Sequence, residues 1–237
     1  QVTPPTYRFD IAIEADLIEE VGRVYGYERL PLQPLSGALE VQPLTETAVG
    51  MQDVADVLVK RGYQEAVTYS FVDPEFQSAV NPGMEAITLA NPISAEMSVM
   101  RTSLLPGLLG AVLRNTNRQR SRVRLFETGL RFLPDDTGLQ QVPTLGLVTT
   151  GARNEESWAA DNAGADFFDI KGDLESLLAL TRSPAAYAFE PASLPGLHPG
   201  QTARVTRQGQ PVGYVGALHP SVNAELGLTA PVYACEI

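Results

Sequence analysis

Residues 101–132, RTSLLPGLLGAVLRNTNRQRSRVRLFETGLRF, hold a strong helix signal followed directly by a strand signal. The first part predicts a helix over Leu104–Gln119, because leucine and valine recur at the i, i+4, i+8 spacing that gathers them on one helix face. Thr102 or Ser103 can cap the start of this helix. The second part predicts a strand over Arg122–Phe132. A helix leading into a long strand is the unit from which we interpret the rest of the chain.

Working outward, the remaining segments alternate irregularly between helix and strand patterns. We expect further helices at Glu14–Tyr25, Glu46–Arg61 and Phe168–Thr181, and a short one from Pro220. We expect further strands at Tyr7–Ile13, Ala66–Val72, Ile87–Ala90, Pro143–Thr150, Gln201–Arg207, Pro211–Leu218 and Pro231–Ile237. Short turns between successive strands favour an α+β fold, an antiparallel sheet flanked by helices, over a doubly wound parallel sheet. Three prolines in residues 30–45 indicate a linker.

Composition excludes several classes of protein. Apolar residues make up 44% of the 237, which is enough for a core and excludes a disordered chain. A single cysteine, Cys235, excludes a disulfide framework and a cysteine-based zinc site. The sequence shows no membrane-length apolar run and no signal segment, so we expect a cytoplasmic protein.

Charge is unevenly distributed along the chain. The net charge is −11, yet residues 101–131 contain seven arginines and one acid, a local charge of +6 that leaves −17 for the rest. The overall sign argues against a general nucleic-acid binder. The arginine segment is a candidate contact surface for phosphate or for an acidic partner. The alternative is a solvated helix end and strand face.

One compact group of acidic residues could carry chemistry. Asp16, Glu19, Glu20 and Arg23 share one face of the first predicted helix, and Asp10 lies six residues before Asp16. Adjacent carboxylates repel unless a cation compensates, and Mg²⁺ prefers oxygen ligands of this kind. The alternative is a solvated acidic helix face. The sequence contains no P-loop, dinucleotide fingerprint, HExxH or GxSxG motif.

Several stretches together resemble one family. They are VTPPTYRFDIAIEADLIEEVGRVYGYERLP (2–31), RGYQEAVTYSFVDP (61–74), NPISAEMSVMRTSLLPGLL (91–109), SRVRLFETGLRF (121–132), DIKGDLESLL (169–178) and LHPGQTA (197–203). In this order and spacing they closely resemble the beta subunit of bacterial phenylalanine–tRNA ligase, and the resemblance extends over essentially the whole chain.

The resemblance implies an architecture and a metal site. Residues 1–35 would end a small domain as a short β-α tail, residues 36–45 would form a linker, and residues 46–237 would form a core like that of class II aminoacyl-tRNA synthetases. Asp10, Asp16, Glu19 and Glu20 match the family's Asp-x5-Asp-x2-Glu-Glu pattern. The resemblance associates this pattern with a Mg²⁺ shared with the alpha subunit.

The resemblance also implies a function. The ligase joins phenylalanine to its tRNA using ATP, in an assembly of two alpha and two beta subunits. The alpha subunit handles phenylalanine and ATP, while this module scaffolds assembly and is catalytically silent; the glycine-rich third class II motif has no counterpart here. The alternatives are an independent metal-dependent enzyme using the four carboxylates, or an RNA-binding module using the 101–131 arginines.

Overall fold

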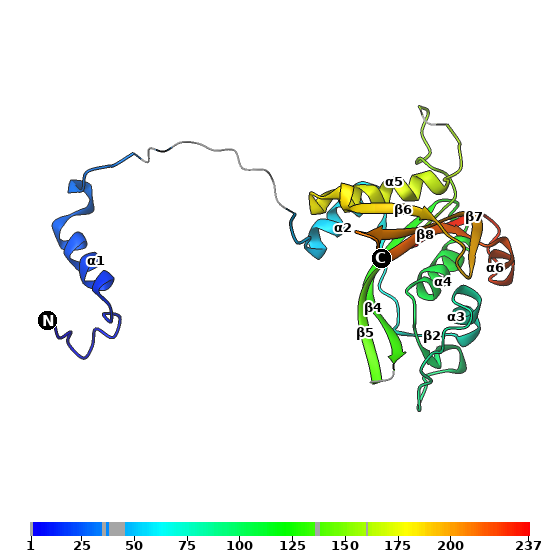
Figure 1. The fold of residues 1–237 in the computed structure, drawn as a ribbon, viewed down its shortest axis with the longest axis horizontal. Helices are drawn as coiled ribbons and strands as arrows, with labels where there is room; N and C mark the ends of the chain where they lie inside the picture. Colours follow the sequence, from blue (N-terminus) through cyan, green and yellow to red (C-terminus); the bar gives the residue numbers. More distant parts are fainter. Residues whose placement is uncertain (1, 35–36, 38–45, 136–137, 160) are drawn as a thin grey trace. The chain divides into compact units, whose positions relative to one another are not determined.

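The structure, a computed structural model, describes residues 2–34, 37, 46–135, 138–159 and 161–237 (Figure 1). The chain divides into two compact units, Gln1–Pro43 (unit 1) and Leu44–Ile237 (unit 2). The linker predicted for 36–45 lies outside the described residues, apart from residue 37. The two units are described separately below.

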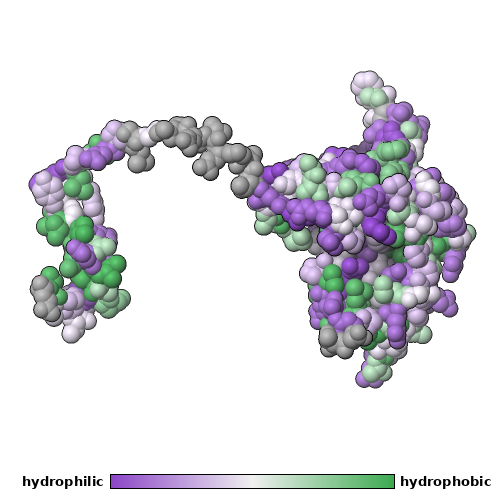
Figure 2. Space-filling view, in the orientation of Figure 1, coloured by the Kyte–Doolittle hydropathy of each residue, from purple (hydrophilic) through white to green (hydrophobic). Residues whose placement is uncertain are grey.

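The described residues of unit 1 form one α-helix, α1 (Glu14–Tyr25), with the predicted bounds. Gly26, at φ 101°, ends it in a backbone conformation that favours glycine, and the 3-10 turn η1 (Tyr27–Arg29) follows. The apolar face of α1 is exposed, including Ile18 and Val21, and Figure 2 shows hydrophobic surface on this unit. The amphipathic pattern therefore predicted the helix correctly, although its apolar face has no packing partner among the described residues of unit 1.

The strand predicted at Tyr7–Ile13 is not formed, so that prediction is wrong. This segment instead makes turns, in which the N–H of Arg8 donates to the carbonyl of Pro5 at 2.9 Å and the N–H of Ile11 donates to the carbonyl of Arg8 at 3.4 Å. A strand requires a neighbour to pair with, and the described part of unit 1 offers none.

Unit 2 is built on a seven-stranded sheet in the order β1-β4-β5-β9-β8-β7-β6 (Figure 1). Its strands are β1 (Gln64–Glu65), β4 (Val123–Asp135), β5 (Gly138–Thr150), β6 (Tyr187–Pro191), β7 (Leu197–Arg207), β8 (Gln210–Leu218) and β9 (Val232–Glu236). All neighbours are antiparallel except the parallel pair β1–β4. The predicted antiparallel sheet with flanking helices is confirmed in this mostly antiparallel form.

Helices cover both faces of the sheet. They are α2 (Met51–Lys60), α3 (Pro74–Val80), α4 (Leu105–Thr116), α5 (Phe167–Leu178) and α6 (Pro220–Glu225), with 3-10 turns η2 (Ala95–Met97), η3 (Ala179–Thr181) and η4 (Pro184–Ala186). One hydrophobic core joins α3, α4 and α6 to one face, which we call the α4 face. A second core joins α2 and α5 to the opposite face, the α5 face. Cys235, in β9, is fully buried in the second core.

Helix α4 packs directly onto the backbone of the sheet. Leu104 and Leu108 are fully buried, and a Cβ added to Gly146 of β5 would lie 3.0 and 2.9 Å from their side chains. Glycine at this position therefore allows an approach that any larger residue would block. The predicted cap is present in part, because Oγ of Ser103 accepts from the N–H of Leu105 at 3.0 Å.

Three other predicted elements differ from the structure. Helix α2 begins at Met51, not at residue 46, because the N–H of Thr47 donates to the carbonyl of Thr181 and Glu46 pairs with Arg207. The single strand predicted at 66–72 is wrong. The chain leaves the large sheet after Ala66, whose N–H donates to the carbonyl of Phe126, and forms strand β2 (Phe71–Val72) only later.

The segment between these strands is diverted by α4. The side chain of Thr68 packs on Gly107 of α4, 2.2 Å from where a Cβ there would stand, and its hydroxyl donates to the side chain of Glu127 of β4. Strand β2 pairs instead with β3 (Val99–Met100) in a separate two-stranded sheet. The strand predicted at 87–90 is reduced to one isolated bridge, between Thr88 and Val99. None of the described helices is long and apolar enough to cross a membrane.

Candidate functional site

The four carboxylates predicted to bind metal lie in unit 1, and Arg8 connects two of them. Nη2 of Arg8 donates to Oδ2 of Asp10 and to Oε1 of Glu20, each at 2.8 Å. Nη2 of Arg23 donates to the second oxygen of Glu20 at 2.7 Å. The hydrogen bond from Arg8, followed by that from Arg23, lowers the pKa of Glu20 to about 2. The compensating cations at Glu20 are thus arginines.

The other two carboxylates have different surroundings. Oδ2 of Asp16 accepts from the N–H groups of Ala12 and Ile13 at 2.7 and 2.8 Å, which lowers the pKa of Asp16. Glu19 is exposed on α1. Within the described residues, no three carboxylate, histidine or cysteine side chains lie close enough together to hold a metal ion. The structure therefore joins Asp10 and Glu20 through Arg8 and uses Asp16 at the start of the helix.

On the α4 face, a buried ion pair lies between α4 and the sheet. Nη1 of Arg101 donates to Oε1 of Glu127 at 2.7 Å, and both side chains are only 4% exposed. Thr68 donates its hydroxyl to the other oxygen of Glu127 at 2.7 Å, and Nε of Arg101 donates to the carbonyl of Leu130 at 2.8 Å. Arginine and glutamate satisfy each other here, as buried charges require.

A second buried carboxylate on the same face belongs to Glu236. It accepts hydrogen bonds from the N–H of Leu104 at 2.6 Å, from the hydroxyl of Ser103 at 3.0 Å and from the hydroxyl of Tyr214 at 3.0 Å. Burial nevertheless raises the pKa of Glu236. Glu236 therefore ties the start of α4 to strands β8 and β9.

On the α5 face, Asp173 accepts hydrogen bonds from three residues. Nε of Arg61 donates to it at 2.5 Å, the hydroxyl of Tyr63 at 2.8 Å and Nη1 of Arg124 at 3.2 Å. Burial, followed by the charge of Asp173, raises the pKa of Tyr63 well above its usual value. This network joins α5 to α2 and to the first residues of β4.

The arginines of residues 101–131 do not form one surface. Arg101 and Arg124 are buried in the ion pairs above, and the side chain of Arg122 is only 21% exposed. The exposed members are Arg114, Arg118 and Arg120, at and beyond the end of α4. The segment's local charge of +6 is thus largely internal or divided between different faces.

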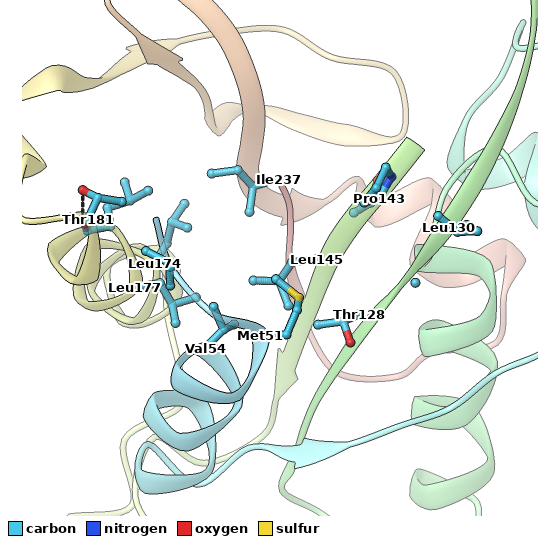
Figure 3. Close-up of a pocket in the computed structure, with 14 residues that line it drawn as sticks. Met51, Val54, Thr128, Leu130, Pro143, Leu145, Leu174, Leu177, Thr181 and Ile237 are labelled. Atoms are coloured by element: carbon cyan, nitrogen blue, oxygen red, sulfur yellow. Dashed lines mark hydrogen bonds between the residues drawn. The ribbon is translucent and has the colours of Figure 1, made fainter. Parts of the chain in front are cut away.

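An apolar groove runs beside α2 (Figure 3). It has a volume of about 480 Å³. Helices α2 and α5 supply Val54, Leu174 and Leu177, and the strands supply Leu145 and Leu130. Its lining contains no charged side chain. The groove can accommodate apolar groups, and its only polar side chains are threonine hydroxyls with no ionisable side chain beside them in the lining.

The buried carboxylates Glu127, Asp173 and Glu236, which tie helices to the sheet, were not predicted from the sequence. One signal was available: Asp173 lies three residues after Ile170 and four before Leu177, on the apolar face of its helix. Glu236 similarly interrupts an apolar strand. A charge inside an apolar pattern indicates a buried partner, but it does not say which one.

The fold is shared with a solved aminoacyl-tRNA synthetase. The chain superposes on the Desulfitobacterium hafniense pyrrolysyl-tRNA synthetase PylSc with a TM-score of 0.55 and 14% sequence identity, over 79% of this chain and 64% of that one. At this identity the likeness concerns the fold alone. The match therefore supports the mostly antiparallel sheet flanked by helices as a fold shared with that synthetase.

Sequence comparison gives the family. Residues 30–237 match the family described as the phenylalanyl tRNA synthetase beta chain CLM domain, and residues 1–27 match the tRNA synthetase B5 domain. This chain belongs to the family of phenylalanyl-tRNA synthetase beta chains.

Curated relatives agree with this assignment. The phenylalanine–tRNA ligase beta subunit of Vibrio cholerae is 51% identical over 240 residues and that of Pseudomonas fluorescens Pf-5 is 49% identical over 237, each covering 100% of this chain. The chain spans 30% of the length of these relatives. The matches do not support the two alternatives, an independent metal-dependent enzyme and an RNA-binding module built on residues 101–131.

Proposed function

We propose that this chain is the catalytically silent assembly module of a phenylalanine–tRNA ligase beta subunit. In this proposal the whole ligase joins phenylalanine to its tRNA using ATP in the cytoplasm, as an assembly of two alpha and two beta subunits. The alpha subunit handles phenylalanine and ATP, tRNA binds the holoenzyme, and this chain binds no ATP. In this proposal unit 2 is a class II synthetase core that does not catalyse the reaction.

The packing of α4 on the sheet is the observation that carries the proposal. Leu104, Leu105 and Leu108 are at most 1% exposed, and Gly146 has no room for even a methyl group beneath them. A nucleotide cannot lie where α4 contacts the sheet. Next to this contact, Arg101 is neutralised by Glu127, so its positive charge is not available to bind a polyphosphate.

Apolar surface at α2 supports the assembly role. Met51 and Val59 are exposed on this helix, and the groove of Figure 3 opens next to it. Exposed apolar surface around a groove is typical of interaction sites. We therefore assign the alpha-subunit contact to α2 and the groove.

Association with purified alpha subunit on a sizing column tests this proposal. We expect a complex with the 237-residue chain, and loss of that complex when Val59→Glu places a charge on the exposed face of α2. The matched control, Val212→Glu, alters a partly exposed valine of β8 and should leave the complex intact. Failure of the unaltered chain to associate, or equal binding by the two variants, would contradict the scaffold role.

For the carboxylates of unit 1, we propose a Mg²⁺ site shared with the alpha subunit, formed by Asp10, Asp16, Glu19 and Glu20. An all-oxygen donor set suits this ion. Arg8 opposes it, because its guanidinium already bridges Asp10 and Glu20. Cation binding therefore requires Arg8 to release at least one of these carboxylates.

A competition experiment tests the metal proposal. Arg8→Gln should tighten binding of Mn²⁺, a paramagnetic substitute for Mg²⁺, in the reconstituted assembly. Glu20→Gln should weaken it, while Glu28→Gln, an exposed acid beyond α1, serves as the control. Unchanged Mn²⁺ affinity in both the Arg8 and the Glu20 variants would contradict the metal site and would mean that the carboxylates form only a solvated acidic face.

A further inference from the structure

A polar pocket on unit 2 opens beside the Asp173 network of the α5 face. It is a pocket of about 530 Å³ between the end of α2, the start of β4, the loop at 153–155 and helix α5. Its cationic lining residues are Lys60, Arg61, Arg122, Arg124 and Arg153, and its acids are Glu155, Asp169 and Asp173. Nothing in the proposed assembly role requires such a concentration of arginines.

Arg124 is held rigidly in the wall of this pocket. Its side chain is 7% exposed, and Nη1 donates both to Asp173 and to the carbonyl of Arg61 at 3.2 Å. Its guanidinium carbon lies 5.3 Å from the centre of the Tyr63 ring. Nε of Arg124 is buried and has no hydrogen-bond partner among the described residues. An unsatisfied buried donor is costly, and because this Nε is closed to solvent, a ligand in the pocket would meet Arg124 at its terminal nitrogens.

Arg122 lies beside it and is less well neutralised. Its Nη1 is 3.7 Å from Glu155, which is 82% exposed, so the attraction is weak. Its Nε is also buried without a partner in the described part of the chain. Partial burial, followed by repulsion from Arg124, lowers the pKa of Arg122. A bound anion would offset the repulsion between Arg122 and Arg124 and would favour the charged form of Arg122.

The charge excess is confined to one wall. Lys60, Arg61, Arg122 and Arg124 face only two acids of the pocket, Asp173 and Glu155, which leaves two positive charges. The cation of the opposite wall, Arg153, is held by two carboxylates of its own, Asp166 at 2.7 Å and Asp169 at 2.9 Å. That wall therefore carries a net charge of −1, so the positive excess is local to the side of Arg122 and Arg124.

We propose that this pocket binds the phosphate group of a small phosphomonoester, with Arg122 and Arg124 as its principal donors. Guanidinium groups match the oxygen geometry of phosphate. A monoester carries close to two negative charges at neutral pH, which equals the excess on this wall, whereas a phosphodiester carries one. The close approach of Arg122 to Gly62 fixes its direction, because a Cβ there would lie 3.2 Å from Nη2.

Calorimetric titration of the 237-residue chain with methyl phosphate and with dimethyl phosphate tests the proposal. We expect methyl phosphate to bind and dimethyl phosphate to bind at least about tenfold more weakly, because it lacks one charge. Inorganic phosphate should compete with methyl phosphate. Absence of methyl phosphate binding at millimolar concentration, or equal affinity for the two esters, overturns the proposal.

Variants assign the site to these residues. Arg122→Gln should weaken methyl phosphate binding by about tenfold. Arg122→Lys should weaken it less, because lysine keeps the positive charge but lacks the paired N–H donors of the guanidinium group. Arg118→Gln changes an exposed arginine of the same segment and should have no effect. Lys60→Gln removes a lining cation at the exposed end of α2 and leaves every buried contact in place, so it should also weaken methyl phosphate binding. Equal affinity of all these variants would place the phosphate elsewhere.

Discussion

Substitution of Arg101 by methionine removes the positive charge of the buried pair and keeps much of the side chain's volume. The carboxylate of Glu127 then stays buried with only Thr68 as a polar partner. Because both side chains are only 4% exposed, solvent cannot replace the lost cation. Removing one partner of a buried pair costs about 3–5 kcal/mol of unfolding free energy. That is a large part of the ~5–15 kcal/mol typical of a domain.

The pair can be separated from a simple packing effect by a double variant. Glu127→Leu alone leaves Arg101 buried without its carboxylate and should cost a similar amount. Arg101→Met together with Glu127→Leu removes both charges, so it should be at least as stable as either single variant. Independent contributions would instead make the double variant the least stable of the three.

Urea unfolding followed by far-UV circular dichroism measures these differences. Most of the described helices belong to unit 2, so the signal reports mainly on this unit. Arg118→Met, in an exposed position of the same segment, is the control and should change stability by no more than about 0.5 kcal/mol. A cost below about 1 kcal/mol for Arg101→Met would refute the reasoning, because the charge would then be dispensable.

Three further outcomes follow from single positions. Gly146→Ala should lower the free energy of unfolding in urea by about 1–3 kcal/mol, because the new methyl group would lie 2.9 Å from a leucine side chain of α4. Gly172→Ala, which has open space around it on α5, should stabilise the chain, and similar effects of the two variants would contradict the close packing. The pKa of Glu20 is about 2 in place of 4.5, so its ionised form stabilises the fold above pH 4.5, and this contribution is lost as the pH falls towards 2. An NMR titration of the Glu20 side chain measures this pKa, and Arg8→Gln should shift it back towards 4.5. Cys235 is fully buried and its thiol pKa is raised by burial, so it should resist alkylation until the chain unfolds; rapid modification of the folded chain would refute that burial.

The helices of this fold could be predicted because their apolar periodicity is local. The apolar face of α1 gave its bounds correctly, and Gly26 marked its end. Helix α4 followed from its leucines but ends at Thr116, three residues before the predicted Gln119, which adopts a left-handed φ of 65°. A periodic pattern identifies a helix reliably and locates its end less well.

The strands show why local patterns are insufficient. Tyr7–Ile13 and Ala66–Val72 both alternate like strands, yet neither pairs as predicted. The first has no neighbouring strand among the described residues of its unit, and the second leaves β4 after one further hydrogen bond and packs on α4. Strand formation depends on what lies alongside, which is a property of the folded chain.

The candidate sites were predictable to different degrees. The acidic group on α1 was visible because its residues are close in sequence, but the turn that brings Arg8 between Asp10 and Glu20 was not. The phosphate pocket joins Arg122 and Arg124 to residues near positions 61 and 173. Since those segments are distant in sequence, composition could reveal an excess of arginine without revealing which charges are left unpaired.

Catalytic silence is tested most directly by assaying the 237-residue chain for phenylalanine-dependent exchange of pyrophosphate into ATP in the presence of Mg²⁺. Because Leu104 and Leu108 leave no space above Gly146 and the Arg101–Glu127 pair is closed, the chain alone should show no more exchange than a sample without protein. Exchange should appear when purified alpha subunit is added. Exchange by the chain alone, dependent on phenylalanine, would contradict the account.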